Sequence, residues 1–299
     1  MTRLAFIVAI AMMTAGAAEA EVTFTGNFVQ GGLVHGQTAP GAKVTLDGRP
    51  MHVSPAGEFL LGFGRDAAPT ATVDIVHRDG AHETRTVTVA PRQWDIQRID
   101  GLPEKLVTPP PEVLQRIKDD NAQVAAARAR DTDEMLFKTG FIWPAQGPIS
   151  GVYGSQRILN GQPRSPHYGL DIAAPAGSPV IAPADGIVAL AHPDMYFTGK
   201  TLILDHGYGL STTYSHMSEI AVKVGQRVRR GQTIGKVGAT GRVTGAHLDW
   251  RINLYDIRLD PALVLPPPPA AGAPVSPASG GAATATGPGT GGSTSPSSR

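Results

Sequence analysis

The sequence predicts a mainly β protein, with an amino-terminal antiparallel β-sandwich, a helical linker and a second domain of antiparallel β-sheet. Short runs of β-branched and apolar residues recur at near-regular spacing, and turn dipeptides such as Asp47-Gly48 and Asp79-Gly80 separate them. The chain also contains 36 glycines and 26 prolines among its 299 residues. This combination favours turns and strands over helical bundles.

Residues 1–20 have the pattern of a secretory signal peptide. Arg3 gives a basic start, an apolar run follows from Leu4 to Met13, and small residues end at Ala20. We expect cleavage after Ala20 and a periplasmic or secreted mature protein. No later run reaches 18 uninterrupted apolar residues, so no stable membrane insertion is expected.

Composition excludes several classes of function. Cysteine is absent, which excludes disulfides, thiolate catalysis and cysteine-ligated zinc. The formal charge of +1 gives no indication of nucleic-acid binding. An exported chain without disulfides must be stabilised by its hydrophobic cores, and 299 residues are enough to form them.

Residues 21–100 are predicted to form one small β domain. Strand-like runs occupy residues 22–25, 43–46, 59–62, 72–76 and 86–90. Several short strands at this spacing indicate an antiparallel sandwich. The passage Gly41–Gly48, followed by Gly57-Glu58-Phe59, resembles a bacterial immunoglobulin-like module.

Residues 101–134 differ in composition and predict a proline-rich linker followed by a helix. Pro109, Pro110 and Pro111 precede a stretch of helix formers from Glu112 to about Ala129. A spacing of three and four relates Leu114, Ile117, Asn121 and Val124. This spacing predicts one amphipathic helix that either joins the domains or lies against the second.

Residues 266–299 form a tail of Pro, Ala, Gly, Ser and Thr with almost no charge. Such a segment cannot bury enough apolar surface to fold, so we expect it to be disordered.

The second domain, residues 135–265, again alternates short strands with glycine turns. Strands are predicted at residues 186–191, 201–205, 210–214, 221–224, 233–237 and 246–252. His247 and Asp249 are two apart in the last of these runs, so both should project from one face of a strand. His167 and Asp171 are four apart, and a bend at Gly169 is expected to bring them within reach of one ion.

Seven short motifs follow one another in this part of the chain: Gly151–Arg157, His167–Ala173, Pro179–Val188, Asp205–Gly207, Tyr214–Ser218, Gly225–Gly231 and Gly238–Leu248. Their order resembles that of the lysostaphin-like (LytM-type) zinc endopeptidases, which cut peptide cross-links of bacterial cell walls. The resemblance implies that His167 and Asp171 bind the metal ion. It also implies that His216 and His247 handle protons and the developing oxyanion; we favour His247 as the base.

Three further residues are candidates for substrate contact. Arg157 lies in the first of the seven motifs, whereas Tyr168 and Tyr214 flank site residues. A structural role is the alternative for each of them. His206 is predicted to be structural, and His192 is predicted to lie at the surface of a loop.

Asp249 departs from the family, whose last motif is His-x-His with the second histidine as a metal ligand. A carboxylate is also a zinc ligand, and it would complete a set of one histidine and two carboxylates. This harder set leaves Mn²⁺ as an alternative to Zn²⁺. Asp249 could instead mark a metal-free domain.

Three classes of function follow. The preferred one is an exported zinc endopeptidase that hydrolyses peptide cross-links of peptidoglycan with a histidine general base. The second is a catalytically silent wall-binding protein or a regulator of another wall enzyme. The third, a biotinyl- or lipoyl-type carrier or adaptor, ranks last because the segment between its two half-motifs lacks the required hairpin lysine.

Overall fold

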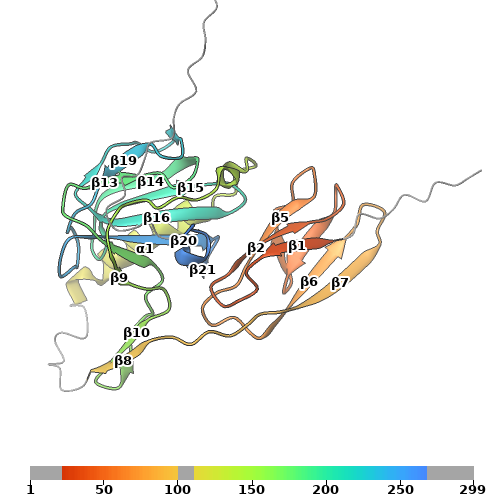
Figure 1. Cartoon of the computed structure of the whole chain (residues 1–299), viewed down its shortest axis with the longest axis horizontal. Helices are drawn as coiled ribbons and strands as arrows, with labels where there is room; N and C mark the ends of the chain where they lie inside the picture. Colours follow the sequence, from red (N-terminus) through yellow and green to blue (C-terminus); the bar gives the residue numbers. More distant parts are fainter. Residues whose placement is uncertain (1–21, 100–110, 268–299) are drawn as a thin grey trace, which may run out of the picture.

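The structure of the chain is a computed structural model that describes residues 22–99 and 111–267 (Figure 1). The expected signal peptide, residues 100–110 of the linker and nearly all of the expected tail lie outside the described residues. The described part is mainly β with antiparallel sheets, as the sequence predicted.

Two sheets form the amino-terminal sandwich. The first contains β1 (Thr23–Gly26), β2 (Leu33–Gln37) and β5 (Glu58–Gly62), and the second contains β4 (Arg49–Met51), β3 (Lys43–Leu46), β6 (Thr70–Val76) and β7 (His82–Thr88). Along β6, Ala71, Val73 and Ile75 are buried between less buried neighbours, as expected for a strand with one face on a core. Their face packs against Val34 and Leu61 of the first sheet.

The Asp47-Gly48 dipeptide forms the turn between β3 and β4. Both residues have positive φ values, 47° and 78°. This is the backbone of the two-residue turns that match the twist of a β-hairpin, and glycine adopts it without steric cost. The dipeptide therefore has the role that the sequence indicated.

A larger sheet organises the carboxy-terminal region, residues 135–267. Its order is β18 (Arg227–Val228), β14 (Gly186–Met195), β15 (Gly199–Asp205), β16 (Leu210–Met217), β20 (His247–Leu254), β12 (Leu170–Ala173) and β9 (Ile149–Gly151), with β21 (Ile257–Leu259) paired to β20. A small sheet of β13 (Pro179–Ile181), β19 (Thr233–Lys236) and β17 (Glu219–Ile220) packs on one face of it. The short helix η4 (Pro261–Leu263) follows β21.

The strand predicted at residues 221–224 is absent. Strand β17 ends at Ile220, and the Ala221 backbone N–H makes one further bond, of 2.9 Å, to the Ile234 carbonyl. Val224 is 54% exposed. Its β-branched side chain suggested a strand, but it has no core to pack against.

Alternation along β20 separates a core face from a polar face. Leu248, Trp250, Ile252 and Leu254 are completely buried. His247, Asp249, Arg251 and Asn253 alternate with them, so they point to the opposite side of the sheet. That polar side is where the candidate site lies.

The predicted helix is present as η2 (Pro111–Val113) followed by α1 (Leu114–Arg128), and it packs against β14 and β15. Its expected apolar face is only partly correct. Ile117 and Val124 are half-buried, whereas Leu114 is 52% exposed. The helix therefore lies against the second domain along its later turns. The short helix η3 (Leu136–Thr139) follows it.

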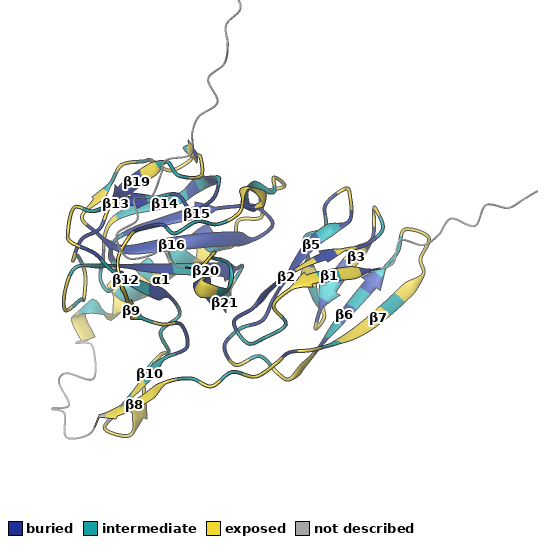
Figure 2. Cartoon of the chain, viewed as in Figure 1, coloured by how far each residue is buried: buried dark blue, intermediate teal, exposed yellow. Residues whose placement is uncertain are grey.

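The sandwich and the carboxy-terminal region share an apolar contact. Leu33 and Leu60 of the sandwich lie in one buried cluster with Phe137, Leu254 and Leu259. Figure 2 shows buried residues in dark blue on strands of both regions. A second connection lies where β8 (Ile96–Ile99) pairs in parallel with β10 (Gln156–Leu159), which also pairs with β11 (Gln162–Pro163). Figure 1 shows the extended segment that runs from the sandwich to this small sheet.

Candidate active site

Three residues predicted as metal ligands meet on the polar side of the large sheet. Asp171 on β12 lies directly opposite Asp249 on β20 in the antiparallel register. His167 approaches from the segment that precedes β12. One ligand atom from each of the three lies within 4.8 Å of the others.

His167 lies in a loop and not on a strand. Strand β12 begins at Leu170, and the segment with His167 is a loop. The backbone of His167 is held at both ends, because its N–H donates to the Ser155 carbonyl (2.7 Å) and its carbonyl accepts from the Gly154 N–H (2.8 Å). A loop shortens the distance to Asp171 that a straight strand would impose.

Gly169 is required for close approach rather than for an unusual φ. A Cβ built at this position would lie 2.4 Å from the Oδ1 atom of Asp249 and 2.9 Å from the Trp250 carbonyl oxygen. Only glycine lets the loop pass this close to β20. The expected bend at Gly169 is therefore a packing requirement.

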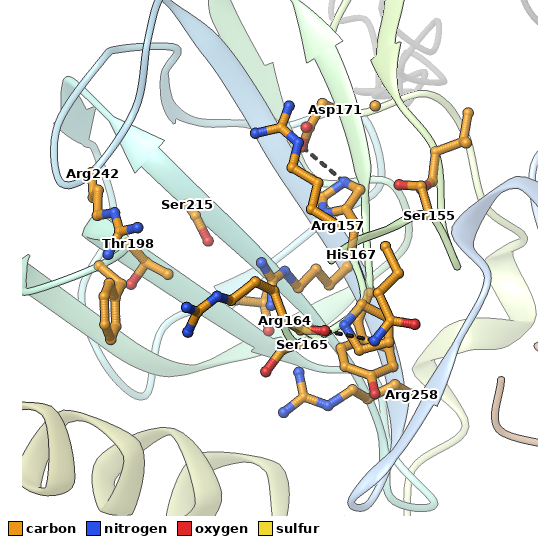
Figure 3. A pocket seen from close by; sticks show the side chains of 18 of the residues that line it. Ser155, Arg157, Arg164, Ser165, His167, Asp171, Thr198, Ser215, Arg242 and Arg258 are labelled. Atoms are coloured by element: carbon orange, nitrogen blue, oxygen red, sulfur yellow. Dashed lines mark hydrogen bonds and ion pairs between the residues drawn. The ribbon is translucent and has the colours of Figure 1, made fainter. Parts of the chain in front are cut away.

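The cluster fits a divalent cation. The His167 Nε2 and Asp171 Oδ1 atoms lie 3.1 Å apart, at ion-pair distance (Figure 3), but both are buried and neither makes a hydrogen bond of normal geometry. Buried polar atoms left in this way are costly unless a further group satisfies them. One imidazole nitrogen and two carboxylates form a donor set that zinc accepts.

Asp249 has a partner that the sequence prediction missed. The Arg251 guanidinium donates from Nε to Oδ1 (2.9 Å) and from Nη2 to Oδ2 (2.5 Å) of its carboxylate. Burial alone raises the pKa of the Asp249 carboxyl, but the Arg251 charge and hydrogen bonds outweigh burial and lower it. Side chains two residues apart on a strand share a face, so the alternation that groups His247 with Asp249 also places Arg251 beside them. This pattern in the sequence could have indicated the Arg251 partner.

Two histidines beside the cluster make the same kind of hydrogen bond through their Nδ1 atoms. The Nδ1 atom of His247 lies 3.0 Å from the Gly245 carbonyl, and that of His216 lies 2.9 Å from the Thr240 carbonyl. A carbonyl accepts only, so each Nδ1 carries the proton in the neutral ring and each Nε2 is left as a base. The His247 Nε2 lies 3.9 Å from the Asp171 Oδ1 atom. The two ring centroids are 4.9 Å apart.

His216 has an unusual backbone. Its φ is +64°, a conformation that costs about 1–3 kcal/mol for a residue with a Cβ. The bond from its backbone N–H to the Thr198 carbonyl (2.8 Å) helps to hold it there. Burial lowers the pKa of the imidazole and outweighs the opposing effect of the Thr240 carbonyl, so the ring is neutral at neutral pH.

A cleft of about 1050 Å³ extends from the cluster (Figure 3). His167 and Asp171 line one part of it, and Ile117, Val124 and Arg128 of α1 line another. The lining is strongly basic. Six arginines contribute to it, Arg128, Arg157, Arg164, Arg242, Arg251 and Arg258, against three aspartates, Asp95, Asp120 and Asp171.

The other sequence candidates divide between the cleft and the core. Arg157 and Tyr168 line the cleft. Tyr214 does not, and its prediction as a substrate contact is wrong: it is fully buried on the core face, with its hydroxyl 2.9 Å from Thr212 Oγ1. His206 is fully buried between the Asp185 carbonyl and Thr212, as expected of a structural residue. His192 lies on β14 rather than in a loop, outside the cleft lining.

Comparison with known proteins identifies the family. The model of peptidase family M23 matches residues 165–261. The crystal structure of a putative peptidase M23 from Pseudomonas aeruginosa is 32% identical, with a TM-score of 0.62, and the match covers 79% of this chain and 94% of that one. The chain belongs to peptidase family M23. The match to the M23 family model includes His167, Asp171, His216, His247 and Asp249.

Curated relatives in the M23 family are longer proteins. The peptidoglycan DD-endopeptidase ShyA of Vibrio cholerae is 46% identical over 90 residues, which are 29% of this chain and 20% of ShyA. The cell division protein DipM of Caulobacter vibrioides is 34% identical over 166 residues, 54% of this chain and 26% of DipM. The M23 chain thus spans between a fifth and about a quarter of their lengths. Among the helices of its described residues, none is long and apolar enough to cross a membrane.

Proposed function

We propose that the chain is an exported metal-dependent endopeptidase that hydrolyses peptide cross-links of bacterial peptidoglycan. The observation that carries this proposal is the meeting of His167, Asp171 and Asp249 beside His216 and His247, with a cleft that extends from the cluster. Membership of the M23 family and the similarity to a peptidoglycan DD-endopeptidase support the reaction and the substrate class.

His167, Asp171 and Asp249 would hold the metal ion. A bound divalent cation lowers the pKa of a water molecule and polarises the scissile carbonyl. Zinc suits the nitrogen and oxygen donors, and the two carboxylates keep manganese as an alternative. Elemental analysis of the purified protein would distinguish zinc from manganese.

The two histidines have complementary roles in this proposal. His247 accepts a proton from the attacking water at its free Nε2 atom and passes it to the leaving amine. His216 would stabilise the developing oxyanion by donating from Nε2. Because its Nδ1 already donates to the Thr240 carbonyl, this role requires the ring to take up a second proton from solvent at Nε2. Arg157 and Tyr168 contact the substrate from the cleft wall. No role is assigned to Tyr214 because it faces the core.

The remaining sequence predictions describe how the enzyme is delivered and arranged. Residues 1–20 are the signal peptide of a periplasmic or secreted protein, and residues 266–299 are a tail. We assign residues 21–100 to an immunoglobulin-like module, residues 101–134 to the linker and helix, and residues 135–265 to the peptidase domain. The sandwich would support contact with the wall or with other wall enzymes.

A second candidate is a catalytically silent wall-binding protein or regulator. The bidentate hydrogen bonding of Arg251 to Asp249 favours it, because the guanidinium engages the carboxylate that a metal ion would need. The similarity to a cell division protein is compatible with this reading.

Digestion of purified peptidoglycan by the protein without residues 1–20 separates the two candidates. Released fragments are identified by mass spectrometry in the presence of chelator, of restored zinc or manganese, and with His247→Ala. The matched control is His192→Ala, which removes a histidine of β14 that belongs neither to the cleft lining nor to the cluster. If the chain is an endopeptidase, we expect cleavage of cross-links by the unchanged protein and by His192→Ala. Cleavage should be absent with chelator and with His247→Ala. Intact peptidoglycan in every sample would leave the silent protein as the function.

A further inference from the structure

Three arginines face one another in the cleft next to the metal cluster. Arg128 comes from the end of α1, Arg251 from β20 and Arg258 from β21. All three line the same cleft as His167 and Asp171.

The strand register explains why the arginines of the sheet converge. Arg251 lies opposite Thr213 of β16, and Asn253, two residues further along β20, lies opposite Arg258. Side chains of directly opposed residues share a face of the sheet, so Arg251 and Arg258 project to the polar side. Arg128 reaches the same place from above the sheet, where its Nη2 atom donates to Thr213 Oγ1 at 3.2 Å.

Positive charge in this group exceeds the negative charge available to it. Arg251 is paired with Asp249. Among the described residues, no carboxylate lies within ion-pair distance of Arg128 or Arg258. Arg258 stacks instead on the ring of Tyr168, 4.6 Å from the centroid.

Arg128 is the least satisfied of the three. Its Nε atom is buried and has no hydrogen-bond partner. Burial, followed by the charges of Arg258 and Arg251, lowers the pKa of its guanidinium to about 9. The group is still charged at neutral pH. An unpaired charge held this way is destabilising until an anion joins it.

We propose that Arg128, Arg251 and Arg258 form a subsite for a free carboxylate of the substrate, next to the bond that is cut. This inference rests on the proposed function and makes it more specific. Peptide cross-links of bacterial walls carry free carboxylates close to their amide bonds. A planar guanidinium binds a carboxylate through two parallel hydrogen bonds, which fixes orientation as well as affinity.

The subsite gives the linker helix a part in recognition. Arg128 supplies one donor group from outside the large sheet, so a substrate carboxylate would connect α1 to β20 and β21. Since Arg251 also contacts Asp249, binding at the subsite would place the neighbouring amide bond beside the metal cluster.

A binding experiment tests the subsite independently of hydrolysis. The full chain carrying His247→Ala, which prevents turnover, is titrated calorimetrically with a cross-linked muropeptide and with the same muropeptide after conversion of its carboxylates to amides. The subsite predicts that the carboxylate form binds at least about tenfold more tightly, as expected for charge-assisted hydrogen bonds.

Adding Arg128→Gln or Arg258→Gln should remove most of that preference and leave binding of the amide form nearly unchanged. Arg116→Gln is the matched control. It removes the same charge from the same helix, but Arg116 is paired with Asp194 outside the cleft lining. Arg116→Gln should retain the preference, and thermal melts show that each variant is folded.

Equal binding of the two muropeptides by the His247→Ala chain, or binding of neither, would overturn the subsite. The same holds if both Arg128→Gln and Arg258→Gln keep the preference. Such results would reject the subsite without deciding whether the chain cuts peptidoglycan, which the digestion experiment measures separately. A carboxylate preference together with no digestion would retain the subsite and reject the endopeptidase.

Discussion

At the residue scale, the pairing of Asp249 with Arg251 sets the charge of the proposed metal site. A donor set of one neutral imidazole and two carboxylates has a formal charge of −2, and the Arg251 guanidinium beside it reduces the total to −1. The guanidinium also donates to both carboxylate oxygens of Asp249. We therefore expect the cluster to bind a divalent cation less tightly than its donor set alone would suggest.

Zinc titration of the full chain against a competing chelator measures this effect. Arg251→Gln frees the Asp249 carboxylate and should tighten zinc binding by about tenfold, a modest Coulomb effect for a partly screened pair. Asp249→Asn removes a ligand and should weaken binding by about 100-fold or more. The control Arg242→Gln removes an equal charge from a guanidinium that stacks on Phe197 instead, and it should change little.

The opposite result for Arg251→Gln would have a different meaning. Weaker zinc binding in that variant would show that the guanidinium orients Asp249 for the ion rather than competing with it, as hydrogen bonds to metal ligands often do.

The resemblance in motif order covers all three residues of the cluster, which is why the sequence could indicate them together. His167 and Asp171 are four apart around a glycine, whereas Asp249 reaches them through the pairing of β20 with β12. Arg128 and Arg258 could not be predicted in the same way. They are 130 residues apart in the chain numbering, and an arginine at a helix end ordinarily indicates a solvated position. Only the packing of α1 on the sheet brings them together.

At the element scale, a buried histidine connects β16 with the start of β14, the two strands that flank β15 in the large sheet. His206 follows β15, and its ring bridges the Asp185 carbonyl and the Thr212 hydroxyl. Burial lowers its pKa to about 4 from 6.5, and outweighs the Asp185 hydrogen bond that acts in the other direction. The ring is therefore neutral in the folded chain under conditions where an unfolded chain protonates it.

This shift predicts loss of stability in acid. Between pH 6.5 and about 4 the unfolded chain binds the extra proton and the folded chain does not, so the free energy of unfolding falls as the pH falls. The loss at this site amounts to about 3 kcal/mol. Urea unfolding at pH 7.5 and 4.5 measures it. His206→Asn should be less stable at both values, with a smaller difference between them. An undiminished difference would assign the acid sensitivity to other groups.

Strands could be predicted where apolar residues recur over several positions and lie on one face. The runs that became β6, β15, β16 and β20 have an apolar face that remains in the core. The run at residues 221–224 has the right residue types, but its pairing with β19 ends after Ala221 and Val224 is exposed. For α1, the sequence indicated the helix but not the face, because Leu114 satisfies the helical spacing and still points to solvent.

At the scale of the whole molecule, the apolar contact between the sandwich and the carboxy-terminal region limits their relative motion. Leu60 of β5 faces this contact, whereas its neighbour Leu61 faces the core of the sandwich. The two leucines are adjacent, so alternation along the strand gives them opposite roles.

Hydrogen exchange distinguishes these roles. Leu60→Ala should increase exchange in β21, whose Leu259 shares the cluster, because a cavity of this kind costs about 2–5 kcal/mol of contact energy. Leu61→Ala should increase exchange in β2 and β6 and leave β21 protected. If Leu60→Ala leaves β21 unchanged, the two regions are held together by their other connections, which include the ion pair of Arg92 with Asp260 and the parallel pairing of β8 with β10.

One of these connections, the parallel pairing of β8 with β10, has a consequence for how this protein can evolve. Asp95 and Gln97 precede the peptidase region in sequence, yet both line the cleft. Trp94 packs so closely on Gly154 that a Cβ there would lie 1.9 Å from its ring. A recombination event that exchanged the amino-terminal module would also remove one side of the cleft. The two regions should therefore be inherited as a single unit, and a lineage with a different module would need another segment to close the cleft.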